Sequence, residues 1–227
     1  MKEATMGSVV TLADVKARED IQVYISRADR NMEAIGYTEH GFRHAEIVAD
    51  RAGHIISSLG RDSREAELAS IGGYLHDMGN VATRSEHGQV AVMLAYSVLR
   101  EMGMPPTELA EIMSAVGNHE EQHGDPFGSV AAAVIIADKS DVARSRVRDI
   151  HPSRYDEHDR VNYATISSAV TVNHNRTIIS LSLDIDTEIA PIMDYFELFL
   201  DRMVMSRKAA KVLGCDFELM INGTKLL

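Results

Sequence analysis

The sequence has no tryptophan, a single cysteine, few aromatic residues and no long apolar run. Cys215 is the only cysteine, so no disulfide can form within the chain, and a reducing cytoplasm is the expected location. Aromatic residues make up only 5%, which argues against a base-stacking platform. The longest apolar run, Val130 to Ala137, has eight residues, whereas a membrane span needs about 20. No apolar signal core follows the N-terminus, which agrees with a cytoplasmic protein.

The overall composition is that of a folded globular protein. The chain has 227 residues, of which 45% are apolar and 25% charged, enough for one medium domain or one domain with a small appendage. Lys and Arg total 23 against 34 Asp and Glu, a net charge of −11. An acidic surface repels phosphate backbones, so non-specific nucleic-acid binding is not expected. The negative charge does not exclude a small anionic substrate, because bound metal ions can make the electrostatic field at a site positive.

Apolar residues recur at helical spacing over residues 11–150 and predict a helical bundle with short connections. Six helices are expected: one from an N-cap at Thr11 to Ile35, one after Gly41, one after Asp62-Ser63, one around 90–98, one opened by Pro105-Pro106 and one around 131–142.

Residues 151–227 show a different pattern. Apolar residues alternate over 164–172 and 179–185, with turn residues at 173–175 between them, which indicates a β-hairpin. A helix is expected near Pro191 and a short strand over 217–221. The predicted fold is therefore mainly α: a helical bundle over residues 11–150, followed by a β-β-α-β appendage over 151–227.

Six metal-binding side chains fall on the inner faces or at the ends of successive helices. Asp138 continues the apolar stripe of the most apolar helix, and burying an ionised carboxylate there costs several kcal/mol unless a cation or strong donors compensate it. One such residue alone would be explained as a hydrogen-bonded core residue. Together the six predict a transition-metal site in the bundle core: His44, His76, Asp77, His87, His119 and Asp138.

The order of these residues resembles that of the HD-domain superfamily of metal-dependent phosphohydrolases. His44 precedes the pair His76-Asp77, and Asp138 stands in a segment similar to the final aspartate motif of that family. The resemblance covers about residues 20–150. His87 and His119 resemble the extra histidines of the subgroup that holds two metals. Nine residues separate Asp77 from His87, and no Gly-Tyr-Pro follows His119, so the pattern is more similar to compact stand-alone HD hydrolases than to the HD-GYP branch.

The resemblance implies a site with two divalent metals and hydrolysis of a small phosphorylated substrate. One metal would take His44, His76, Asp77 and Asp138, and the second would take Asp77, His87 and His119. Iron or manganese is expected first, with zinc as the alternative. His76, Asp77 and Lys139 are the expected catalytic residues, Lys139 as a contact to a phosphate oxygen. The expected substrate is a phosphomonoester or phosphodiester, with a nucleotide as the favoured class.

Two other functions use the same residues. Some HD proteins with similar ligands are diiron oxygenases, and a non-catalytic module could respond to metal or nucleotide binding by moving the appendage. A homodimer formed through the hairpin edge is a further option.

Several residues near the six are secondary candidates. Arg43 and Arg84 could bind substrate phosphate, and Glu120 or Glu121 could orient His119. His40 is expected on the surface at the start of a helix, although it could add a ligand, and His158 is expected on the surface.

Overall fold

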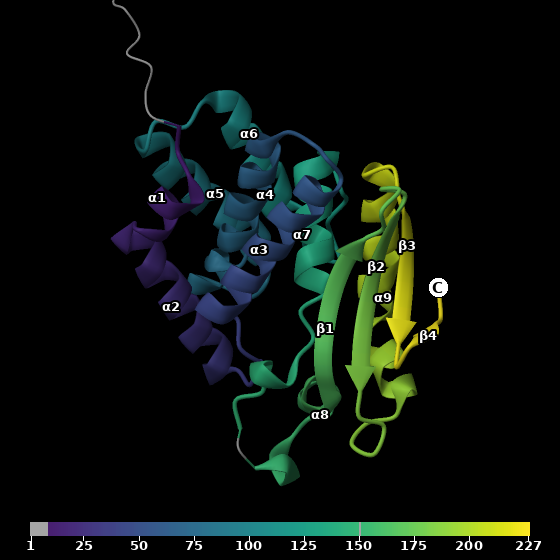
Figure 1. The fold of residues 1–227 in the computed structure, drawn as a ribbon. Coiled ribbons are helices and arrows are strands. Elements are labelled where there is room, and N and C mark those ends of the chain that lie inside the picture. Colours follow the sequence, from purple (N-terminus) through teal and green to yellow (C-terminus); the bar gives the residue numbers. More distant parts are fainter. Residues whose placement is uncertain (1–8, 150) are drawn as a thin grey trace, which may run out of the picture.

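The computed structural model describes residues 9–149 and 151–227, with a helical bundle first and a small sheet last (Figure 1). Residues 1–8, where no signal core was found, lie outside the described residues, as does position 150 at the predicted boundary. None of the helices within the described ranges is both long and apolar enough to cross a membrane.

The bundle consists of seven α-helices and two short 3-10 helices: α1 (Leu12–Lys16), α2 (Glu19–Ala34), α3 (Phe42–Ser58), α4 (Ser63–Leu75), η1 (Met78–Val81), α5 (His87–Glu101), α6 (Pro106–Gly117), α7 (Gly128–Lys139) and η2 (Arg144–Arg146). The predicted caps at Asp62 and Pro105-Pro106 are confirmed, since the Asp62 side chain accepts a hydrogen bond from Arg64 N and Pro106 begins α6.

The prediction of one helix from Thr11 to Ile35 is wrong, because the chain forms two. Thr11 does cap the first, in a reciprocal capping box with Asp14. At Arg18 the backbone is extended (φ −73°, ψ 121°), and its guanidinium pairs with Asp20 and Glu101. These ion pairs accompany a change of direction that the apolar spacing does not reveal.

Helix α7 lies at the centre of the molecule and contacts α3, α4, α6 and α9. Every side chain from Val130 to Ala137 is at most 2% exposed, so the longest apolar run of the sequence forms the innermost helix. Because α7 is buried on all sides, Asp138, which directly follows this run, lies deep in the bundle.

The C-terminal region contains η3 (Pro152–Arg154), α8 (Glu157–Ala164), β1 (Thr165–Val172), β2 (Ile178–Ile185), α9 (Ile192–Val212), β3 (Asp216–Ile221) and β4 (Thr224–Lys225). The predicted hairpin, helix and strand are confirmed. Helix α8 was not predicted, because its sequence is polar, although Asp156 caps it by accepting from Asp159 N. The strand order is β1-β2-β3-β4, with β2 and β3 parallel and the other two pairs antiparallel.

Helix α9 connects the parallel strands β2 and β3 and packs between them and α7 (Figure 1). Leu181 and Leu219, which are register partners on β2 and β3, are buried, as is Phe199 of α9. This packing places α9 against the bundle.

Two expectations from the sequence stay predictions. One is the pairing of two chains across a sheet edge, and the other is the division of the chain into two regions near residue 150.

Two adjacent glycines of α4 differ in the space around them and provide a test of this packing. A Cβ on Gly73 would lie 2.9 Å from Val48 O and 3.0 Å from Ala49 N, both backbone atoms of α3. A Cβ on Gly72 would meet only side-chain carbons, Ala115 Cβ and Val134 Cγ2, each at 3.4 Å.

We therefore expect Gly73→Ala to lower the free energy of unfolding by about 1–3 kcal/mol, because α3 must move away from α4. The control Gly72→Ala should change the free energy of unfolding little, because the gain in helix propensity of about 1 kcal/mol offsets the cost of the tight contacts around the added Cβ. Urea denaturation of both variants measures the difference. Equal stability of the two variants would contradict the close helix approach.

Candidate metal centre

The six predicted ligand residues meet at one place because five helix ends point toward it. His44 lies in the first turn of α3, and His76-Asp77 directly follow α4. His87 begins α5, and His119 follows α6 by two residues. Asp138 is in the last turn of α7. All four imidazoles are at most 2% exposed and Asp77 is 8% exposed. The structure thus brings together every residue predicted for the site.

The first group of donor atoms comes from α3, the end of α4 and the end of α7. Nε2 of His44 lies 3.2 Å from Nε2 of His76 and 3.5 Å from Oδ2 of Asp77. Asp138 Oδ1 lies 3.4 Å from His44 Nε2 and 3.7 Å from His76 Nε2. These four side chains surround one small volume.

The second group shares Asp77 with the first. Its other oxygen, Oδ1, lies 3.0 Å from His87 Nε2 and 3.7 Å from His119 Nε2. The two histidine Nε2 atoms are 2.9 Å apart. Asp77 therefore presents one carboxylate oxygen to each group.

Each histidine is oriented by a hydrogen bond through its Nδ1. His76 donates to Gly73 O (2.7 Å) and His119 to Val116 O (2.6 Å). His87 Nδ1 lies 3.1 Å from Arg84 O, and His44 Nδ1 lies 2.7 Å from Asp141 Oδ2. Because these partners are oxygens that accept, Nδ1 of each ring carries a proton, and Nε2 faces the cluster, where it either donates a proton to a carboxylate or offers its lone pair to a cation.

This arrangement fits a metal ion. Two inward Nε2 lone pairs at 2.9 or 3.2 Å repel each other unless a cation or proton lies between them. Donors bound about 2.1 Å from one ion at tetrahedral or octahedral angles are themselves about 3 Å apart. Three sets of donor atoms are close enough to hold an ion: His44-His76-Asp77, His76-His119-Asp138 and Asp77-His87-His119.

The charges of the cluster support one another. Burial by itself raises the pKa of Asp77, but the charge of His76 and hydrogen bonds from His119 and His87 outweigh it and hold the pKa well below the usual range. For Asp138 the opposing burial effect is outweighed first by Lys139, so this pKa is also well below the usual range. Both carboxylates are therefore ionised and ready to bind a cation.

A second layer of charged residues holds the ligands in place. Asp141 is fully buried and accepts from His44 Nδ1 and from Arg43 Nη2, each at 2.7 Å. Arg43 is thus engaged by Asp141 and by Glu39 (3.0 Å), and its contact with substrate phosphate stays a prediction. Asp141 was not predicted to hold His44. The available signal was its position three residues after the predicted ligand Asp138.

Glu120 or Glu121 was expected to orient His119, but each contacts another residue. Glu120 Oε1 accepts from Gly88 N (2.9 Å) and lies 3.3 Å from His87 Nδ1, so it contacts His87 rather than His119. Glu121 instead pairs with Lys139 at 2.9 Å. Lys139 is buried between Glu121 and Asp138 (2.8 Å), and its contact with a phosphate oxygen stays a prediction.

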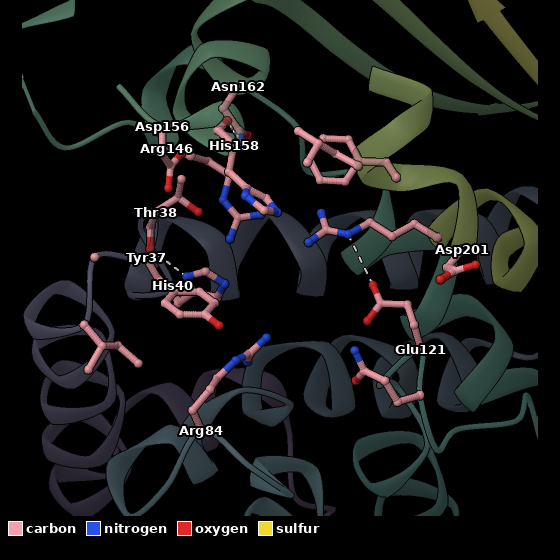
Figure 2. Close-up of a pocket in the computed structure, with 16 residues that line it drawn as sticks. Tyr37, Thr38, His40, Arg84, Glu121, Arg146, Asp156, His158, Asn162 and Asp201 are labelled. Atoms are coloured by element: carbon pink, nitrogen blue, oxygen red, sulfur yellow. Dashed lines mark hydrogen bonds and ion pairs between the residues drawn. The ribbon is translucent and has the colours of Figure 1, made fainter. Parts of the chain in front are cut away.

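A pocket of about 450 Å³ lies next to the cluster and is connected with it through Arg84, although its lining includes none of the six ligand residues (Figure 2). Arg84 is in its wall, with Nη1 3.3 Å from His87 Nε2. Figure 2 shows Arg84, Arg146 and His158 directing nitrogen atoms toward the same space. His40 is half-buried and lines this pocket, so its expected place on the surface is wrong. His158 is exposed as predicted, but it also lines the pocket, which no periodicity in the sequence indicated.

The buried Asp141 carboxylate provides a test of the second layer. Burial raises its pKa, but the His44 hydrogen bond and the charges of Arg146, His44 and Arg43 prevail and hold it well below the usual range. Asp141→Asn leaves the buried Arg146 and the half-buried Arg43 without this charge, so we expect a loss of about 3–5 kcal/mol in the free energy of unfolding at pH 7.

The stabilisation by Asp141 is present above the unfolded-state pKa of about 3.9 and is lost as the pH falls through the lower folded-state value. The stability difference between wild type and variant should therefore narrow below about pH 4. Urea denaturation across this pH range measures it, with Asp50→Asn on the exposed side of α3 as the control. A variant as stable as wild type at pH 7 would contradict the role of Asp141.

Comparison with known proteins shows what the segment that carries the cluster is similar to. Residues 41–145 match the family model of the HD domain. Ribonuclease Y of Lawsonia intracellularis is 31% identical over 112 residues, which cover 49% of this chain and 20% of that protein. An uncharacterized protein of Methanocaldococcus jannaschii is 28% identical over 138 residues, covering 50% of this chain and 52% of the relative.

The chain thus spans about half or less of the length of these relatives. A solved structure of a predicted HD superfamily hydrolase from an uncultured Thermotogales bacterium is 21% identical, with a TM-score of 0.45, and covers 59% of this chain and 75% of that one. The matched residues 41–145 contain all six residues of the cluster. Through this segment the chain is similar to the HD domain family.

Proposed function

We propose that this protein is a metal-dependent phosphohydrolase that acts on a phosphomonoester or phosphodiester of a small molecule, with a nucleotide as the favoured class. The observation that carries the proposal is the convergence of four inward-facing histidine Nε2 atoms on two buried carboxylates, with the two oxygens of Asp77 divided between two donor groups. A single metal site would leave one group of facing lone pairs without a cation.

In this proposal His44, His76, Asp77 and Asp138 hold one metal, and Asp77, His87 and His119 hold the other. Mixed imidazole and carboxylate ligation suits iron, manganese or zinc, and iron or manganese is our first expectation. When bound, paired divalent metals supply an activated water near neutral pH and neutralise charge on phosphoryl oxygens.

The residues around the cluster prepare it for an anionic group. Arg84 contacts Asn80 Oδ1 and the His87 ring rather than a carboxylate, so its charge is available beside the site. Lys139 holds Asp138 through an ion pair, and Asp141 fixes the ring of His44. These contacts keep the ligand atoms in place.

The size of the pocket and the charge of the chain favour a small substrate. A volume of about 450 Å³ is within the range of small-molecule sites. The name of the Lawsonia relative describes a ribonuclease, and phosphodiester hydrolysis is compatible with the proposed chemistry. For this chain the net charge of −11 disfavours a long polyanion, so we propose a small phosphoester instead.

The proposal is tested by metal content and by hydrolysis. Protein purified without oxygen should contain about two metals per chain and should hydrolyse p-nitrophenyl phosphate or bis(p-nitrophenyl) phosphate. Asp77→Ala should lose both metals and reduce hydrolysis at least about 100-fold, because Asp77 serves both groups. Elemental analysis and a chromogenic assay measure the two effects.

Asp50→Ala, which removes an exposed carboxylate from α3, is the matched control and should keep metal and activity. Retention of both metals in Asp77→Ala would refute the assignment. Iron together with oxygen uptake and no hydrolysis would instead favour a diiron oxygenase. Metal binding without turnover would favour a non-catalytic module.

A further inference from the structure

The pocket beside the cluster is built mainly by parts of the chain outside the HD match. Of its sixteen lining residues only Arg84, Glu121 and Gln122 lie within residues 41–145. The others come from the segment before α3, from η2, and from α8 and α9. The wall that a substrate would meet away from the metal ligands is therefore supplied by regions of this chain that the family match does not include.

Arg202 of α9 is the charged group that the C-terminal region adds to this wall. Its Nε lies 3.2 Å from Glu121 Oε1, and its guanidinium carbon lies 4.4 Å from the centre of the Phe199 ring. Both contacts fix the guanidinium plane while its side chain stays 26% exposed. A guanidinium carries five N–H donors, so one contact through Nε leaves donors for a ligand.

Ion pairs link Arg202 to the metal centre. Glu121 Oε1 pairs with Lys139 Nζ at 2.9 Å, and the same Nζ pairs with Asp138 Oδ2 at 2.8 Å. From Asp138 to Arg202 the charges alternate in sign, and each is compensated by its neighbour. This row fixes the position of Arg202 relative to the cluster.

Arg84 is a second oriented guanidinium, on the cluster side of the pocket. It lies 5.1 Å from the centre of the Tyr37 ring, with Nη1 beside His87. Each of the two arginines therefore lies over an aromatic ring that lines the same pocket. Arg146 adds a buried positive charge, although its donors are used by backbone carbonyls of Glu39 and Asp141.

Two of the three acidic residues that line the pocket are engaged, and the third, Asp201, is exposed. Asp156 accepts from Asp159 N as the cap of α8, and Glu121 is shared by Lys139 and Arg202. Two oriented guanidinium groups at different positions match a ligand with two separate anionic groups better than a ligand with one.

Resting on the proposed function, we propose that Arg202 binds a second phosphate group of the substrate, away from the phosphate that reacts beside Arg84 and the metal ligands. The substrate class is then a small bisphosphorylated compound of nucleotide size. Arg202 is a specificity residue, and the C-terminal region serves to select the substrate.

The test uses the full chain treated with a chelator, so that no probe is hydrolysed. Calorimetry measures the affinity for adenosine 3′,5′-bisphosphate and for adenosine 5′-monophosphate. Wild type should bind the bisphosphate about tenfold or more tightly than the monophosphate, as one charge-assisted contact allows. Arg202→Met keeps the alkyl packing on Phe199, and it should remove this preference while leaving monophosphate affinity within about threefold.

Arg207→Met is the matched control, because Arg207 is exposed on the same helix and its loss changes the net charge equally. Arg202→Lys keeps the positive charge but lacks the planar guanidinium, so it should retain part of the preference for the bisphosphate. This variant replaces Arg202→Met in the test if Arg202→Met does not fold. Equal binding of the two probes by wild type, an unchanged preference in Arg202→Met, or an equal loss in Arg207→Met would overturn the inference.

The assay of the metal-loaded chain separates this inference from the proposed function. Hydrolysis of p-nitrophenyl phosphate without any bisphosphate preference would overturn only the role of Arg202. A bisphosphate preference that depends on Arg202 in a chain without hydrolytic activity would support that role and contradict the proposed function.

Discussion

The structure depends on one electrostatic constraint: four imidazoles and two carboxylates share a buried volume at the meeting point of five helix ends. Buried polar atoms must have partners, and each ring meets this need through Nδ1, with Gly73 O and Val116 O as the clearest examples. With Nδ1 engaged, every Nε2 lone pair turns inward, where only a cation or a proton can lie favourably between facing nitrogens. The orientation that satisfies the second layer is thus the orientation that prepares the cluster for metal.

Two sets of charged residues hold this cluster in place. Asp141, with Arg43 and Arg146, fixes His44 and the start of α3. On the other side Lys139 and Glu121 fix Asp138 and continue to α9. Because each charge has an opposite neighbour, the bundle can bury several ionised side chains near its centre. The same pairs make the position of the C-terminal region part of the geometry of the site.

The HD segment and the regions around it contribute different things. Residues 41–145 hold all six ligand residues, whereas most of the pocket wall comes from the segment before α3 and from α8 and α9. Helix α9 can reach the pocket because it packs on α7, which carries Asp138 at its last turn. In the proposed function this arrangement separates the chemistry, which the family shares, from substrate selection, which this chain adds.

The sequence by itself determined most of the helices, the hairpin and the six ligand residues, because apolar spacing and caps such as Asp62 act over a few neighbouring residues. It also indicated that Asp138 needs a cation, since the carboxylate ends an apolar helix. The break at Arg18 and the polar helix α8 were missed, because neither alters apolar periodicity. Only the tertiary structure decided that Glu120 faces His87, that His40 and His158 line a pocket, and that Arg202 meets Glu121. Most of these contacts join residues distant in the chain, and their formation depends on how helices pack rather than on any local pattern.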